Sequence, residues 1–134
     1  MRGHGRRSFR RHEIWWCSIP DHHAERPEFS DGPAERRHPF LILSTNEITG
    51  SGLAIGVPGT SGATGESRWF LNVSPEELIV KPGDRPLAID TCFLFQHLRS
   101  IRLGRLSGRA GMLRGMPRVR AEEILKALFR LEEA

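Results

Sequence analysis

The fold is decided by two apolar runs, Arg36-Arg37-His38-Pro39-Phe40-Leu41-Ile42-Leu43-Ser44 and Leu53-Ala54-Ile55-Gly56-Val57-Pro58-Gly59-Thr60-Ser61. Both are short and rich in branched aliphatic side chains, and turn residues bound them, so each predicts a buried strand. We expect these strands at 39–44 and 53–57, with the chain turning through 46–52. A cationic tip precedes the first strand, and a tip of glycine and hydroxyl residues at 59–65 follows the second. The two tips could therefore face one phosphate group.

Further strands are expected on both sides of this pair, at 13–19, 69–73, 87–94 and 98–101, with an interruption near 95–97. A short helical turn should begin at Ser74, because serine followed by proline and two glutamates is typical of a helix N-terminus. From Pro117 onward apolar residues recur at helical spacing, which predicts an amphipathic helix over about 117–131. Five or six short strands followed by one helix indicate a mainly β fold, a small barrel capped by a helix.

One domain is expected, because 134 residues suffice for a single modest core. Residues 1–11 are rich in arginine and glycine and contain one sizeable apolar side chain, Phe9, so they should form a flexible basic arm. The single domain should then span 12–134. A long connection rich in proline and acidic residues occupies 20–38, and long connections in small domains usually have a function.

Charge is unevenly distributed along the chain, whose net charge is +4 and whose pI is about 10.0. Arginines gather in 2–11 and 99–121, neither of which contains a carboxylate, whereas 21–35 carries five carboxylates and one arginine. This distribution predicts a basic surface beside an acidic loop, and the excess of positive charge favours a polyanion as a partner. Solvated arginines with no ligand would give the same composition, so both interpretations stay open.

Two cysteines, Cys17 and Cys92, lie inside apolar stretches, where a buried and reduced thiol is the usual outcome. Their number and spacing fit neither a disulfide framework nor a zinc site, and we expect no metal and no cofactor. No stretch approaches the ~20 apolar residues of a membrane span, and the basic N-terminus lacks the apolar run of a signal peptide. A cytoplasmic protein is expected.

Four motifs, in a fixed order, resemble the MazF/PemK family of toxin endoribonucleases. They are Glu13-Ile14-Trp15-Trp16, His38-Pro39-Phe40-Leu41-Ile42-Leu43-Ser44, Val57-Pro58-Gly59-Thr60-Ser61 and Gln96-His97-Leu98-Arg99-Ser100-Ile101. The resemblance implies an SH3-like barrel and a homodimer. It also implies metal-independent, sequence-selective cleavage of single-stranded RNA, such as mRNA, to 2′,3′-cyclic phosphate and 5′-OH ends, controlled by a cognate antitoxin protein.

The family's catalytic hydroxyl falls on Thr60, with Ser61 beside it, and its catalytic arginine, which precedes the proline, falls on His38. Arg37 lies one residue earlier. In an extended strand it points to the opposite face, and it reaches the same site only if the chain is irregular there. Histidine can transfer protons near neutral pH, but it cannot grip a phosphate as a guanidinium does. The catalytic candidates are thus Arg37, His38, Thr60 and Ser61.

A second departure concerns Phe95, which stands where some family members have an aspartate before the glutamine. A general base would then come from another group: His22, His23, His97 or an acidic residue of the 21–35 loop. The candidate RNA-contacting residues are Arg36, Gln96, Arg99, His22 and His23.

Plainer roles remain open for these residues. His38 could be a polar strand start, Arg37 could pair with Glu35 or Asp31, and Thr60 and Ser61 could be turn residues. The tryptophans fit a core or an interface, although one exposed indole could stack on a nucleotide. Two other functions therefore compete with the nuclease: a non-catalytic barrel that inhibits a protein target, as the CcdB branch of this fold does, and a basic RNA-binding module.

Overall fold

The computed structural model describes residues 8–18, 37–61 and 67–130, and strands dominate them. The strands are β1 Glu13–Ser18, β2 Arg37–Ile42, β3 Leu53–Thr60, β4 Phe70–Val73, β5 Leu78–Ile79, β6 Thr91–Leu94, β7 Arg99–Arg102 and β8 Leu106–Leu113. The α-helices are α1 Asn46–Gly50 and α2 Gly115–Phe129, and short 3-10 turns occur at η3 Pro75–Glu77, η4 Phe95–His97 and η5 Leu103–Arg105.

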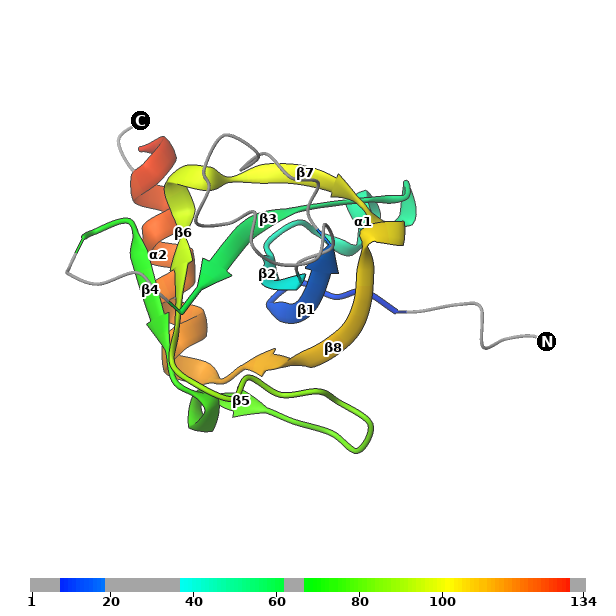
Figure 1. The fold of residues 1–134 in the computed structure, drawn as a ribbon. Helices are drawn as coiled ribbons and strands as arrows, with labels where there is room; N and C mark the ends of the chain where they lie inside the picture. The colour runs from blue at the N-terminus through cyan, green and yellow to red at the C-terminus, as the bar shows by residue number, and fades with distance from the viewer. Residues whose placement is uncertain (1–7, 19–36, 62–66, 131–134) are drawn as a thin grey trace, which may run out of the picture.

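The strands pair in the order β4-β6-β3-β2-β1-β8-β5, and β7 forms a second antiparallel ladder with β3. After β7 the chain passes through η5 into β8, which pairs with β1. The strands β8, β1, β2, β3 and β7 therefore surround a common interior, and Figure 1 looks down into this small barrel. Helix α2 lies along one side of it, next to β4 and β6.

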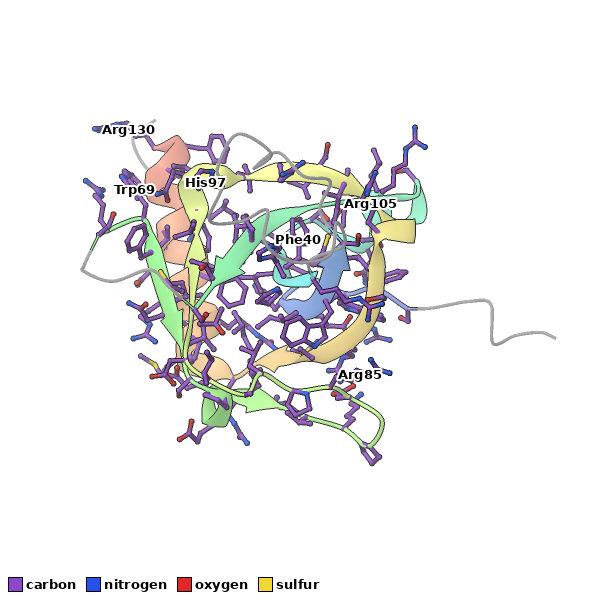
Figure 2. The ribbon with its side chains drawn as sticks, in the orientation of Figure 1. Phe40, Trp69, Arg85, His97, Arg105 and Arg130 are labelled. Carbon is purple, nitrogen blue, oxygen red and sulfur yellow. The ribbon has the colours of Figure 1, made fainter. Side chains whose placement is uncertain are left out.

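Two apolar clusters pack against the two faces of the barrel wall, because side chains alternate along each strand. The interior cluster draws a member from every barrel strand: Trp15, Cys17, Phe40, Ile42, Ala54, Ile101 and Leu106. Figure 2 shows Phe40 within this ring of strands. The outer cluster includes Ile14, Leu41, Val57, Phe93 and Ala121, and it lies between the barrel wall, β4, β6 and α2.

The predicted fold class, a mainly β barrel with a C-terminal helix, is confirmed, while several element boundaries differ. The strand predicted at 53–57 continues to Thr60, and the strand predicted at 87–94 begins only at Thr91. The interruption near 95–97 is the 3-10 turn η4, and the helix starts at Gly115 instead of Pro117.

Strands β5 and β8 were not predicted, because β5 has only two residues and β8 lacks a strand-like composition. β8 includes Gly108, Arg109 and Gly111, which favour turns or exposed surface, yet it is the long strand that pairs with β1. The pairing shifts register at two points along β1, which accommodates these residues. Its position is thus set by its partner strands and not by local propensity.

The described part of the basic arm, residues 8–11, lies against the barrel. The Phe9 and Trp15 ring centroids are 4.5 Å apart, and both Arg11 and His12 bond the carboxylate of Glu122 on α2 at 2.8 Å. Residues 1–7 of the predicted arm lie outside the described residues. Within the described ranges, no helix has the length and apolar character needed to cross a membrane.

Candidate functional site at the barrel mouth

Strand β2 places Arg37 and His38 on opposite faces of the barrel wall. In the ladder with β1, His38 lies opposite Cys17, whose side chain belongs to the interior cluster, and Arg37 lies opposite Ser18. Directly opposed residues in an antiparallel ladder project to the same side. His38 is therefore at the mouth of the barrel interior, and Arg37 projects from the outer face.

Thr60 belongs to the same side as His38. Phe40 of the interior cluster pairs with Pro58, the last pair of the β2–β3 ladder, and alternation puts His38 and Thr60 on the same side of the wall as this pair. Thr60 is the last residue of β3 and is partly exposed, with Cys92 opposite it on β6. A hydroxyl and an imidazole from two distant motifs thus belong to the same side of the barrel wall, each two residues beyond the last β2–β3 pair.

Arg99 and Arg105 bring positive charge to this mouth. Ala54 and Ile101 pair within the interior cluster, so the next inward-facing pair along the ladder is Gly56 and Arg99. Arg105 donates a hydrogen bond from a guanidinium nitrogen to the carbonyl oxygen of Ser18 at 3.3 Å. Two of the arginines in 99–121, Arg99 and Arg105, therefore lie at this candidate site.

The thiols near the mouth remain protonated at neutral pH. Burial raises the pKa of Cys17 to about 11, and the nearby charges of Arg99 and Arg105 oppose this rise without overcoming it. Burial likewise raises the pKa of Cys92. Because the thiolate is the reactive form, neither cysteine is suited to act as a nucleophile.

The remaining sequence candidates are placed as follows. Ser61 follows Thr60 and is exposed, and Gln96 is exposed on η4, which packs against β3 and α2. Arg36, His22 and His23 lie outside the described residues. Phe95 is fully buried in the outer cluster, so a core residue occupies the position at which an aspartate was expected from some family members.

Among the described residues, no three of His, Cys, Asp and Glu lie close enough to hold a metal ion.

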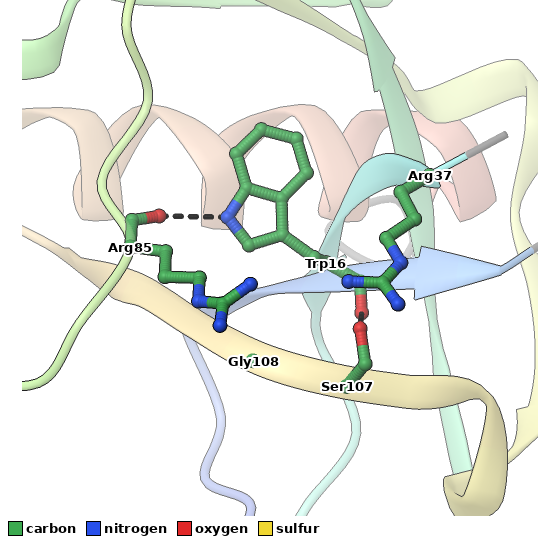
Figure 3. Close-up of a pocket in the computed structure, with 5 residues that line it drawn as sticks. All are labelled: Trp16, Arg37, Arg85, Ser107 and Gly108. Atoms are coloured by element: carbon green, nitrogen blue, oxygen red, sulfur yellow. Dashed lines mark hydrogen bonds between the residues drawn. The ribbon is translucent and has the colours of Figure 1, made fainter.

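On the outer face, Arg37 joins Trp16, Arg85, Ser107 and Gly108 around a pocket of about 240 Å³ (Figure 3). Arg85 and Ser107 were not candidates from the sequence, because neither lies in a motif.

Comparison with known proteins agrees with this architecture. A family model described as PemK-like, MazF-like toxin of type II toxin-antitoxin system matches residues 10–131. A comparison with curated protein sequences gave no match.

Solved structures share the fold at low sequence identity. The toxin MazF-mt6 of Mycobacterium tuberculosis has a TM-score of 0.63 at 13% identity, over 88% of this chain and 96% of that chain. An endoribonuclease in complex with its cognate antitoxin, from a mycobacterial species, has a TM-score of 0.62 at 14% identity, with 92% and 96% covered. A MazE-MazF structure from Deinococcus radiodurans has a TM-score of 0.59 at 17% identity, with 92% and 97% covered.

The family model spans nearly the whole chain, and the barrel, the terminal helix and the motif order agree with it. The chain belongs to the PemK-like, MazF-like toxin family of type II toxin-antitoxin systems.

Proposed function

We propose that this toxin is a metal-independent endoribonuclease that cleaves single-stranded RNA at the barrel mouth and leaves 2′,3′-cyclic phosphate and 5′-OH ends. The observation that supports the proposal is the alternation along β2 and β3, which puts His38 and Thr60 on the interior side that Arg99 shares. Family membership supports the reaction class.

The chemistry assigns a different task to each group at the mouth. The ribose 2′-OH loses its proton and its oxygen attacks the phosphorus, and the bond from phosphorus to the 5′ oxygen breaks as that oxygen gains a proton. Histidine side chains ordinarily exchange protons near neutral pH, so within the proposal His38 accepts the 2′-OH proton and returns a proton to the leaving 5′ oxygen. The Thr60 hydroxyl and the Arg99 guanidinium stabilise the extra negative charge on the phosphorane.

Arg37 does not share this set of groups, since β2 is a regular strand from Arg37 to Ile42 and alternation directs it to the outer face. Within the proposal, His38 alone therefore occupies the place of the family's catalytic arginine. Ser61 and Gln96 are proposed to contact RNA beside the mouth. RNA contacts are also proposed for Arg36, His22 and His23, which lie outside the described ranges.

A cognate antitoxin and a second copy of the chain are the proposed protein partners. Both follow from family membership, and antitoxin complexes occur among the structural neighbours. Light scattering of the purified toxin measures whether it forms the homodimer, and a mass of one subunit at micromolar concentration would refute it.

The experiment is a cleavage assay on a panel of single-stranded RNAs in excess EDTA, with the ends of the products identified. His38→Ala and Thr60→Val, which retains the shape of threonine without its hydroxyl, should each lower kcat by about 10²-fold, as expected for lost proton transfer or oxyanion stabilisation. Arg102→Ala is the matched control, because Arg102 is exposed on the neighbouring strand β7 and alternation directs it away from the interior. Wild-type protein that cuts no RNA in the panel would refute the proposal.

A non-catalytic toxin is the second candidate, and the histidine in place of the family's arginine favours it. Such a protein would inhibit growth through a protein target. In that case growth inhibition would persist in His38→Ala and Thr60→Val, and total RNA from the inhibited cells would show no new 5′-OH ends.

A further inference from the structure

The outer pocket lies on the opposite face of the barrel wall from the proposed cleavage site. Its lining consists of Trp16, Arg37, Arg85, Ser107 and Gly108, and its volume is about 240 Å³. Figure 3 shows the guanidinium groups of Arg37 and Arg85 on either side of the indole of Trp16. None of the lining residues is acidic.

The indole at the pocket is fixed in place by the protein. Its ring nitrogen donates a hydrogen bond to the carbonyl oxygen of Arg85 at 2.7 Å, and the ring also packs against the outer core cluster. Gly108 lies opposite Trp16 in the ladder with β1, and it has no side chain to cover the ring. An aromatic surface is thus left open toward the pocket.

The segment that provides Arg85 is anchored along the edge of β8. The Arg85 amide donates to the carbonyl oxygen of Arg109 at 2.7 Å, and the Arg109 guanidinium pairs with the carboxylate of Asp84. Arg109 also donates to the buried carboxylate of Glu13 at 3.1 Å. This wall of the pocket is therefore preformed, and a ligand would not have to order it.

The charges at the pocket are uncompensated within the described residues. Arg109 and Arg11 are held by carboxylates, whereas the guanidinium groups of Arg37 and Arg85 pair with no carboxylate in that part of the chain. Two like charges beside one cavity repel each other, and a bound anion removes the repulsion. Guanidinium groups bind phosphate in a bidentate manner and also stack on aromatic planes.

An open indole face between two guanidinium groups suits a nucleotide, whose planar base stacks and whose phosphate is anionic. An acidic peptide would satisfy the arginines, but its carboxylates would leave the flat ring unused. The cavity offers room for one base with its phosphate, and a duplex does not fit.

We infer that this pocket holds one unpaired nucleotide of the RNA substrate, away from the scissile phosphate, and so positions the strand on the toxin. The inference rests on the proposed nuclease function and extends it from the mouth of the barrel to its outer face. Arg37, which the sequence suggested as catalytic, is here a substrate-positioning residue.

The test measures binding of 2′-O-methyl oligonucleotides, which lack the attacking hydroxyl, by fluorescence anisotropy. One probe has about 12 nucleotides, and the other has three, too short to span both sites. The variants are the double change Arg37→Gln with Arg85→Gln, and Gly108→Val, which fills the pocket beside Trp16. At Gly108 an added Cβ would lie 3.7 Å from the Arg85 side chain and 4.0 Å from the Trp16 ring, so the first carbon fits without strain.

The long probe should bind each variant about tenfold more weakly, as expected for the loss of one stacked base or of phosphate contacts. The slope of log K against log salt should shrink by about 0.7 for each arginine removed. Binding of the short probe and the melting temperature should be unchanged, and Arg102→Gln should behave like wild type with both probes.

Three results would overturn the inference. Wild-type affinity of the pocket variants for the long probe would refute it while leaving the nuclease intact. Equal losses for both probes would indicate a general change in the protein. A loss of affinity for a poly-glutamate peptide with RNA binding unchanged would reassign the pocket to an acidic protein partner. By contrast, wild-type protein that neither binds nor cuts RNA would refute the proposed function itself.

Discussion

Replacement of Gly56 by alanine tests whether the closely packed β2–β3 ladder determines this fold. A Cβ at Gly56 would lie 2.0 Å from the carbonyl oxygen of Leu41 and 2.8 Å from the Phe40 ring. The Phe40 ring can rotate slightly, but the carbonyl oxygen belongs to the backbone of the neighbouring strand. A shift of more than 1 Å is needed to restore an ordinary contact, and it would break ladder hydrogen bonds.

The expected cost follows from this geometry. Overpacking relieved by side chains costs about 1–3 kcal/mol, so a clash with backbone should lower the free energy of unfolding by at least about 3 kcal/mol. For a domain of this size 1 kcal/mol shifts the melting temperature by about 4 °C, which gives a decrease of roughly 12 °C. Since β3 ends at Thr60, RNA cleavage should fall as well.

Differential scanning calorimetry of Gly56→Ala beside Gly104→Ala measures the effect. Gly104 has no atom within 4 Å of an added Cβ, so its replacement should leave the melting temperature within a few degrees of wild type. Equal melting temperatures for the two variants would refute the packing argument.

Two further outcomes concern buried polar groups. Glu13→Ala should cost about 3–5 kcal/mol in urea unfolding, because it leaves the Arg109 guanidinium and the Trp15 indole without their buried acceptor; a cost below 1 kcal/mol would contradict this reasoning. His12 governs a pH dependence: burial lowers its pKa, so between the unfolded value of 6.5 and the lower folded value the unfolded state binds more protons. The free energy of unfolding should therefore be at its full value with respect to His12 above about pH 6.5, and it should fall as the pH drops toward the lower pKa of the folded state. The urea midpoint of His12→Asn, whose side chain tolerates the φ of 75° at this position, should fall less between pH 7 and pH 5 than that of wild type. An equal fall would contradict the assignment.

Much of the fold follows from local pattern. The runs before Ser44 and after Leu53 form β2 and β3, the serine-proline-glutamate sequence forms the capped turn η3, and helical spacing after Pro117 corresponds to α2. These elements were predictable because hydrophobic periodicity and capping act over a few residues. Strands β5 and β8 were not predictable, because their pairing energy comes from β1 and from each other.

The sequence by itself determined that the chain forms a mainly β domain with a terminal helix, and its motif order gave the family. It also supplied Arg37 and His38 as adjacent candidates. Alternation already predicted that they point to opposite faces of the strand. Only the tertiary structure decided what each face is, since the regular ladder with β1 directs His38 to the barrel mouth and Arg37 to the outer pocket. The physical reason is that alternation along a strand is a local property, while the identity of each face depends on barrel closure by residues far apart in the chain.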